Sequence, residues 1–424
     1  LTITSMPDIH CLTFMNQYIG KELRSIRNYR SLTLRELGEK TGIPYSRLGK
    51  FECGKEMPTD ETILKIGKIL NVDFNKYFNI SKEIDVLFNE FLDSLFYHDQ
   101  SIDLFKAKIS RGREESDVNY VFGKVQLIEY IISVLNHEFD KARSMESELF
   151  EYFKEDYECK ALLYQYKAII FQDEKHFAEA IPYFEKAESL MINRKSKAML
   201  FLHSSVAYKN VGNVAKSMRC IEMAHHIFAE YGSLRRVAFC FVEYGLLLKA
   251  NYQFEKAITQ FNIALRSLEM IECPESLFAK VYRNMCWTMI LAKDYKAALE
   301  YLDEAIEIEP KHGFTVLYAI WCNYKLENYE EAERWINENT HLKSNERFGS
   351  FYEMFDLMVK CQDGIPSIKL INAAAQIIEN FMNGEDYERI NFYLDIILDL
   401  LNRSGREMDK IKYLEMKVNL TKKR

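Results

Sequence analysis

The chain has 424 residues, 48% of them hydrophobic and 28% charged, and its formal net charge is −7. Glycine (16) and proline (7) are scarce, which argues against disorder and against the turn-rich all-β classes. No uncharged apolar run reaches the roughly 18 residues that a membrane-spanning helix requires, and the 9 cysteines are scattered without a C-x-x-C pair. We therefore expect an all-α, cytoplasmic protein that binds no membrane and keeps its thiols reduced.

Charge is distributed unevenly along the chain. Residues 15–79 contain 12 Lys and Arg against 8 Asp and Glu, a net charge of +4, whereas residues 80–424 contain 44 against 54, a net charge of −10. An acidic surface repels phosphate, so any nucleic-acid contact should belong to the basic N-terminal part. The first segment, residues 1–16, is expected to be a loose N-terminal arm.

Helix signals follow one another closely after this arm. A first helix begins at Ile19, where apolar residues recur at helical spacing. Thr33 and Glu36 fit a capping box and start a second helix. That helix ends at Gly42, because glycine readily adopts the left-handed conformation that closes a helix. Pro44 suits the first turn of a third helix.

Two further helices complete this segment. The third helix stops at Gly54, and Thr59 caps a fourth helix over residues 60–70. Residues 73–78 can form a fifth, short helix. The side chains of the fourth helix expected to face inward are Ile63, Ile66, Ile69 and Leu70.

Five short helices with a tight turn between the second and third resemble the Xre-type DNA-binding domain of bacterial and phage repressors. The resemblance covers residues 17–78, and we place the domain at residues 17–80. The matching positions are Ile19-Gly20, Ile26-Arg27, Leu32-Thr33, Gly42-Ile43, Phe51-Glu52, Gly54-Lys55 and Pro58. The resemblance implies a structural salt bridge between Arg27 and Glu52.

In that family the third helix lies in the major groove, where its first residues reach base edges. The resemblance therefore implies four base contacts and three phosphate contacts that hold the register. The base-contacting set is Tyr45, Ser46, Arg47 and Lys50, and the phosphate-contacting set is Arg30, Arg35 and Lys55. Leu34 stands where the family often has glutamine, so one usual DNA contact is missing. The alternative is that these basic residues form only a solvated face.

Motifs for nucleotide binding, metal binding and catalysis are not found in the sequence. Residues 49–55 match the G-x-x-x-x-G-K pattern of a phosphate-binding loop, but Glu56 replaces the Ser or Thr that would bind magnesium, and no strand precedes the pattern. Histidines and cysteines lack the spacing of a zinc site, and no G-x-S-x-G or H-E-x-x-H occurs. We expect no enzyme activity, no cofactor and no bound metal.

The remaining residues, 81–424, contain a repeat. The segments ANYQFEKAITQFNIAL and AKDYKAALEYLDEAIEIEP align, and small residues recur where the two helices of a pair would approach closely. These anchors are Ala142, Ala180, Ser217, Ala257, Ala298 and Ala332, spaced 38, 37, 40, 41 and 34 residues apart, with a weaker unit at Ile390. In most units an apolar residue follows four positions later; Glu146 is an exception. The pattern resembles tetratricopeptide repeats, in which Gly245 would be a retained motif glycine, and implies a right-handed α-solenoid.

Such a solenoid has a concave face lined by the first helix of each pair, which suits an extended peptide. Amides on this face can pair with a peptide backbone, basic residues can hold a carboxylate, and aromatic residues offer side-chain pockets. The expected peptide-binding residues are Gln165, Tyr166, His203, Lys209, Asn210, Phe239, Glu243, Lys280, Arg283, Asn284, Trp287, Tyr318, Trp321 and Tyr324. The alternative is that the aromatic residues pack within the repeats and the basic ones form a solvated face.

An Xre-type domain followed by a tetratricopeptide array resembles the peptide-pheromone regulators of Gram-positive bacteria, the RRNPP group of Rgg, NprR, PlcR and PrgX, and is most similar to NprR. The resemblance implies a transcription regulator used in quorum sensing. A short signalling peptide would bind residues 81–424, which also dimerise, and thereby control binding to a palindromic operator in double-stranded DNA. A homodimer is expected, with a tetramer as a second arrangement. The alternatives are a Rap-like antagonist or phosphatase of a response regulator, or a phage lysis-lysogeny regulator.

Overall fold

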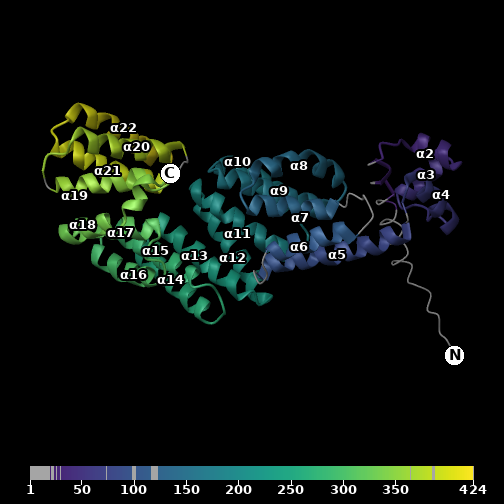
Figure 1. The fold of residues 1–424 in the computed structure, drawn as a ribbon, viewed down its shortest axis with the longest axis horizontal. Helices are drawn as coiled ribbons and strands as arrows, with labels where there is room; N and C mark the ends of the chain where they lie inside the picture. Colours follow the sequence, from purple (N-terminus) through teal and green to yellow (C-terminus); the bar gives the residue numbers. More distant parts are fainter. Residues whose placement is uncertain are drawn as a thin grey trace. The chain divides into compact units, whose positions relative to one another are not determined.

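The computed structural model describes residues 20, 23–24, 26–28, 30–72, 74–97, 102–115, 123–362, 364–383 and 387–423. Every regular element in these ranges is a helix, which confirms the all-α class (Figure 1). The expected arm at residues 1–16 and the start of the first helix at Ile19 lie outside the described residues. The chain divides into two compact units, residues 1–95 with 99–163 and residues 96–98 with 164–424.

The first unit contains the predicted helix-turn-helix. Its helices after residue 28 are α2 (Leu34–Thr41), α3 (Tyr45–Glu52) and α4 (Asp60–Leu70). The capping box at the start of α2 is formed, because Thr33 and Glu36 bond each other's backbone N–H groups. Gly42 closes α2 with a φ of 71°. These local signals are confirmed.

The predicted ion pair of Arg27 and Glu52 is present in this unit. Arg27 donates from Nε to Glu52 Oε1 at 2.6 Å and from Nη2 to Oε2 at 2.8 Å, and its Nη1 donates to the Leu32 carbonyl at 2.6 Å. Both charged residues are buried. Because the pair is bidentate and carries a further hydrogen bond, both buried charges are compensated. It ties the helical residues 26–28 to the end of α3.

Two expectations about this region are wrong. Ile69, expected to face inward, is 36% exposed, because it lies at the edge of the stripe formed by the buried Ile66 and Leu70. The short helix expected at residues 73–78 is the start of α5 (Phe74–Tyr97), a helix of 24 residues. No glycine or proline interrupts that segment, so nothing in it breaks the helix at residue 80.

The helices that follow come in successive pairs, as the repeat spacing predicts. After α6 (Ile102–Glu115), the pairs are α7 (Gly123–Leu135) with α8 (Phe139–Tyr152), α9 (Tyr157–Asp173) with α10 (Phe177–Leu190), α11 (Arg194–Asn210) with α12 (Val214–Glu230), α13 (Leu234–Ala250) with α14 (Phe254–Glu269), α15 (Ser276–Leu291) with α16 (Tyr295–Ile308), and α17 (Gly313–Lys325) with α18 (Tyr329–Glu338). All seven predicted anchors are fully buried. The anchors therefore mark the close helix contacts that the sequence predicted.

The apolar residues four positions after the other six anchors, Phe184, Ile221, Phe261, Leu302, Ile336 and Leu394, are buried as well. At Gly245 a Cβ atom would lie 2.6 Å from the ring of Phe261, so a larger residue here would force the ring to move. Glu146, the exception to the apolar pattern, instead accepts a hydrogen bond from the Tyr130 hydroxyl at 3.3 Å. A polar residue is thus tolerated in this unit because it has a buried partner.

The turn within each of these six pairs has the same conformation. A residue five positions before the anchor has a left-handed backbone, with φ values from 59° to 79°: His137, Lys175, Gly212, Tyr252, Lys293 and Glu327. In the turn at Lys293, its N–H donates to the Ile290 carbonyl and the Asp294 N–H to the Met289 carbonyl, both at 3.0 Å. This is the Schellman arrangement that closes a helix, and five of the six turns form it without glycine.

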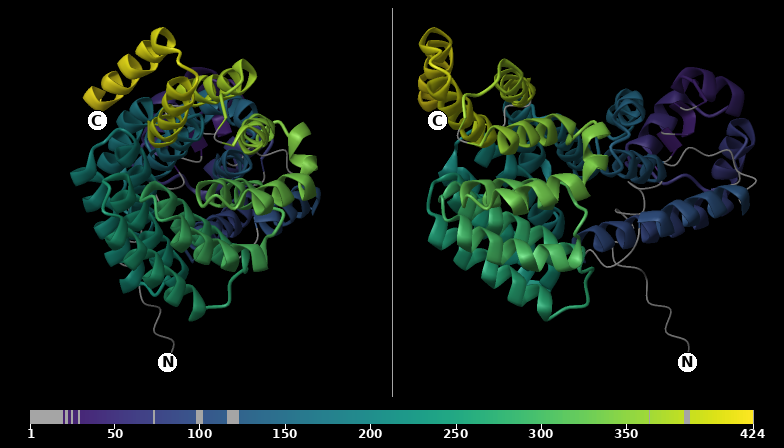
Figure 2. Two further views of the ribbon diagram at one scale, coloured as in Figure 1. Left: turned by 90° about the vertical axis from the view of Figure 1, so that its left-hand side faces the viewer. Right: turned by 60° about the vertical axis from the view of Figure 1, so that its left-hand side comes forward.

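The second unit ends with η1 (Thr340–Ser344), α19 (Gly349–Cys361), α20 (Ile368–Asn383), α21 (Tyr387–Arg403) and α22 (Glu407–Lys423). Helix α19 packs against α17 and α18 (Figure 1). Helix α22, drawn in yellow in Figure 2, packs against α21. None of the described helices is long and apolar enough to cross a membrane.

Candidate nucleic-acid interface and ligand groove

Helix α3 presents one polar face to solvent. Its four predicted base-contacting residues, Tyr45, Ser46, Arg47 and Lys50, are all exposed. Leu48 and Phe51 on the opposite face are buried in the core of the helix-turn-helix. The first N–H groups of a helix have no intrahelical partner, and α3 has no side-chain cap. Polar side chains and free N–H groups therefore meet at the N-terminus of α3.

Two predicted DNA-contacting arginines, one on α3 and one on α2, have side-chain partners. Arg47 donates from Nε to Glu56 Oε1 at 2.7 Å, and its guanidinium lies 5.4 Å from the centre of the Phe51 ring. The guanidinium of Arg35, in the first turn of α2, lies 5.7 Å from the centre of the Tyr45 ring. Such contacts restrict the rotamers of both arginines, which lowers the side-chain entropy that either would lose on binding a ligand.

The remaining predicted phosphate contacts flank these helices. Arg30 is exposed and donates from Nε to the carbonyl of Leu70 at the end of α4, at 3.1 Å. Lys55 is exposed after α3, where its backbone N–H bonds the Lys50 carbonyl at 2.9 Å. All seven predicted DNA-contacting side chains are thus accessible, and their contact with DNA stays a prediction.

In the second unit the predicted peptide-binding residues fall into two groups. In the first group, Gln165 Nε2 lies 3.0 Å from Nδ1 of His203, and the Tyr166 ring lies 6.5 Å from the imidazole. Gln165 and Tyr166 are buried. Burial, and then the charge of Arg236, lower the pKa of His203 to about 3. His203 is therefore neutral near pH 7 and serves as a hydrogen-bonding group.

The other members of this first group are also partnered. Lys209 on α11 and Glu243 on α13 form an ion pair at 2.9 Å, with both side chains largely buried. Asn210 donates its amide to the Val206 carbonyl of its own helix at 2.8 Å. The Phe239 ring lies 5.7 Å from the guanidinium of Arg236. A ligand here would meet a polar surface that is already ordered.

The second group lies on α15 and α17. Lys280 is exposed, Asn284 is half-buried, and Arg283 donates to Glu309 Oε2 at 2.6 Å. The aromatic members stack on one another: Trp287 on Tyr318 with ring centres 5.3 Å apart, and Trp321 on Tyr324 with centres 6.0 Å apart. Stacking of this kind within and between repeats is the packing alternative that the sequence left open.

Helix α21 covers part of this second group. The ring centre of Phe392 lies 4.8 Å from that of Trp287 and 5.3 Å from that of Trp321. Glu388 Oε1 accepts hydrogen bonds from Lys249 Nζ at 2.8 Å and from Trp287 Nε1 at 2.7 Å. Sequence reasoning missed these contacts because they join residues 71 to 139 positions apart, and no local spacing indicates such a pairing.

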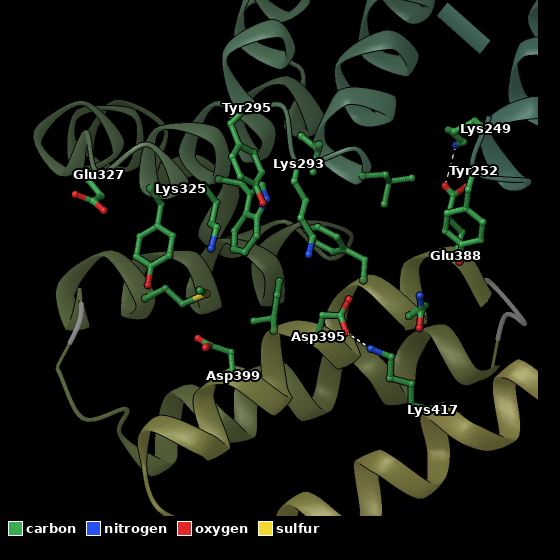
Figure 3. A pocket seen from close by; sticks show the side chains of 18 of the residues that line it. Lys249, Tyr252, Lys293, Tyr295, Lys325, Glu327, Glu388, Asp395, Asp399 and Lys417 are labelled. Atoms are coloured by element: carbon green, nitrogen blue, oxygen red, sulfur yellow. Dashed lines mark hydrogen bonds and ion pairs between the residues drawn. The ribbon is translucent and has the colours of Figure 1, made fainter. Parts of the chain in front are cut away.

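A pocket of about 700 Å³ lies between α21 and the ends of α13, α15 and α17 (Figure 3). This volume is typical of small-ligand sites. Its charged lining residues are Lys249, Lys293, Lys325, Arg403, Lys417, Glu327, Glu388, Asp395 and Asp399, and its rings include Tyr252, Tyr295, Trp321, Tyr324, Tyr329 and Phe392. Only Trp321 and Tyr324 were predicted from the sequence. The described residues contain no group of three or more His, Cys, Asp or Glu arranged to hold a metal ion.

Comparisons with known families find a helix-turn-helix segment followed by helical repeats. Residues 23–77 match the helix-turn-helix family, residues 134–312 the soluble NSF attachment protein family, and residues 289–344 a tetratricopeptide repeat family. The uncharacterized HTH-type transcriptional regulator RghRB of Bacillus subtilis (strain 168) is 26% identical over 96 residues, which are 22% of this chain and 69% of that protein. These matches define a helix-turn-helix domain joined to an array of tetratricopeptide-like helix pairs.

Solved structures share the fold of most of the chain. A Rap protein complexed with competence and sporulation factor is similar with a TM-score of 0.63 at 18% identity, covering 81% of this chain and 98% of the other. NprR in complex with its cognate peptide NprX is similar with a TM-score of 0.58 at 15% identity, covering 80% and 99%. A helix-turn-helix domain followed by an array of this fold is the architecture of RRNPP-type regulators, as the sequence predicted.

Proposed function

We propose that the chain is a cytoplasmic transcription regulator with two tasks. Residues 17–80 bind double-stranded DNA, and residues 81–424 dimerise and sense a short signalling peptide. The observation that carries the proposal is the face of α3, whose four predicted base-contacting side chains are exposed while its apolar face is fixed in the core. That division of faces suits a helix that enters a major groove.

The proposed complex contains two such helices on one operator. A homodimer places two α3 helices on palindromic half-sites about 34 Å apart, one turn of DNA. Neutralisation of phosphates by Arg30, Arg35 and Lys55 would make the affinity fall steeply with salt. A tetramer would pair two such dimers on two operators.

The test is DNA binding by the variant Arg47→Ala/Lys50→Ala. Operators are first selected from random duplexes with the wild-type chain, and affinity is then measured by electrophoretic mobility shift at several salt concentrations. Each lost base contact weakens binding by about 1–3 kcal/mol, so the pair should cost roughly 2–6 kcal/mol. The slope of the logarithm of the affinity against the logarithm of the salt concentration should change little if both residues contact bases and not phosphates.

A matched control removes two lysines from α4, Lys65→Ala and Lys68→Ala, both of which are exposed. It changes the net charge by the same amount but leaves the face of α3 intact. The proposal is wrong if the α3 variant binds the selected operator as tightly as the control does.

The peptide would act by favouring one arrangement of the paired DNA-binding domains. A shift from 1:99 to 99:1 requires about 5.5 kcal/mol of differential affinity. The support for a peptide ligand is the ordered polar surface on α9, α11 and α13 and the similarity in fold to NprR, whose structure contains its cognate peptide. Contacts spread over several repeats would supply that difference.

A second candidate function is a Rap-like antagonist or phosphatase of a response regulator. It is favoured by the similarity in fold to a Rap protein over 81% of this chain. The Arg47→Ala/Lys50→Ala variant separates the two functions, since a response-regulator partner would still be captured by a chain that no longer binds DNA. A phage lysis-lysogeny role would be indicated by a phage integration module beside the gene.

A further inference from the structure

The pocket between α21 and the repeat turns has two unlike walls. Figure 3 shows Lys293 and Lys325 entering from the side of the repeats, opposite Asp395 and Asp399 of α21. Only two of the predicted peptide-binding residues line this pocket. The charges of its lining therefore give information on the charge of a ligand that the sequence alone did not give.

The carboxylates of the α21 wall already have cationic partners. Glu388 is paired with Lys249 at 2.8 Å, Asp395 with Lys417, and Asp399 with Arg403 at 3.7 Å. Each of these pairs is contained within the lining of the pocket. A ligand cation would have to compete with them.

The lysines of the opposite wall differ in this respect. Within the described part of the chain, Lys293 and Lys325 form no ion pair with a carboxylate. Lys293 extends from a turn whose backbone is fixed by two hydrogen bonds of 3.0 Å. The Lys325 ammonium lies 5.6 Å from the centre of the Trp321 ring and 6.0 Å from that of Tyr295. Glu327, on the same wall, also forms no ion pair within the described residues, so the charges left uncompensated in the lining are two positive and one negative, a net of +1.

We propose that this pocket binds the C-terminal carboxylate of the peptide ligand. Lys293 and Lys325 donate hydrogen bonds to the carboxylate, and the rings of Tyr295, Tyr324 and Phe392 receive an apolar side chain at the peptide's end. The proposal rests on the peptide-sensing function proposed above. A chain end suits the site because it presents an anion and a side chain on the same residue.

The experiment uses the full-length protein and two random hexapeptide libraries without Asp or Glu. One library has free carboxyl ends and the other is amidated, so they differ only in the terminal charge. Peptides retained by the protein are counted by mass spectrometry. Charge-assisted hydrogen bonds predict that free-acid peptides are enriched about tenfold or more over their amides.

Three variants test the residues. Lys293→Gln/Lys325→Gln should lose the preference for free acids, and Lys293→Arg/Lys325→Arg should keep most of it. The control Lys256→Gln/Lys296→Gln removes two exposed lysines from α14 and α16, outside the pocket lining, and should behave as wild type. Circular dichroism confirms that each variant is folded.

The outcomes distinguish this inference from the function on which it rests. The carboxylate site is overturned, and peptide sensing is left intact, in two cases. In the first, wild type retains peptides but shows no preference for free acids. In the second, the preference survives in Lys293→Gln/Lys325→Gln. If wild type retains no peptide from either library, the site and peptide sensing both fail.

Discussion

The contact of Glu388 with Lys249 should hold α21 against α13 and α15. The variant Glu388→Gln keeps the shape of the side chain but removes its charge, which leaves the Lys249 ammonium without a counter-ion. The Lys249 side chain is 9% exposed and that of Glu388 is 24% exposed. Breaking a buried ion pair costs about 3–5 kcal/mol. Because Glu388 is partly exposed and glutamine retains an acceptor for Trp287, we expect a loss of about 2–3 kcal/mol.

The same ion pair predicts a dependence on pH. Burial raises the pKa of the Glu388 carboxyl, but Lys249 and the Trp287 N–H outweigh burial, so the net pKa is lowered. A carboxyl whose pKa is lowered on folding stabilises the native state at pH values above its pKa in the unfolded chain, which is near 4.3. That stabilisation should be lost as the pH falls below this value, and Glu388→Gln should lack this part of the pH dependence.

Hydrogen exchange of α21 measures the effect locally, and urea unfolding measures it for the whole chain. The control Glu353→Gln breaks an exposed ion pair with Lys369 in the same unit, where little loss is expected. The double variant Lys249→Met/Glu388→Gln removes both charges and should recover part of the stability. The reasoning is refuted if Glu388→Gln exposes α21 to exchange no more than Glu353→Gln does.

Two further predictions concern the helix pairs. Gly245→Ala places a methyl group against the Phe261 ring and should cost about 1–3 kcal/mol, seen as a lower urea midpoint; an unchanged midpoint would show that the ring moves without penalty. Lys175→Gly should stabilise its turn by up to about 1 kcal/mol, because glycine adopts a positive φ without strain. Gly212→Lys, at the equivalent turn, should destabilise the chain by about as much. The argument fails if the two variants shift the temperature of thermal unfolding in the same direction.

The local elements of this protein were largely predictable. The capping box at Thr33 and Glu36, the closing glycine at Gly42 and the ion pair of Arg27 with Glu52 all occur as predicted. The helix that was predicted too short, α5, lacks a breaker at the expected boundary. A helix end is visible in the sequence where a breaking residue stands, and residues 74–97 contain neither glycine nor proline.

The sequence by itself determined the all-α class, the helix-turn-helix and the anchors of the repeats, because caps, turns and close helix contacts depend on residues a few positions apart. Tertiary structure alone decided that α21 covers Trp287 and Trp321 and forms one wall of a pocket. The residues that meet there are 71 to 139 positions apart. Small changes in the packing of each helix pair add up over that distance, so only the assembled array brings these charges and rings together.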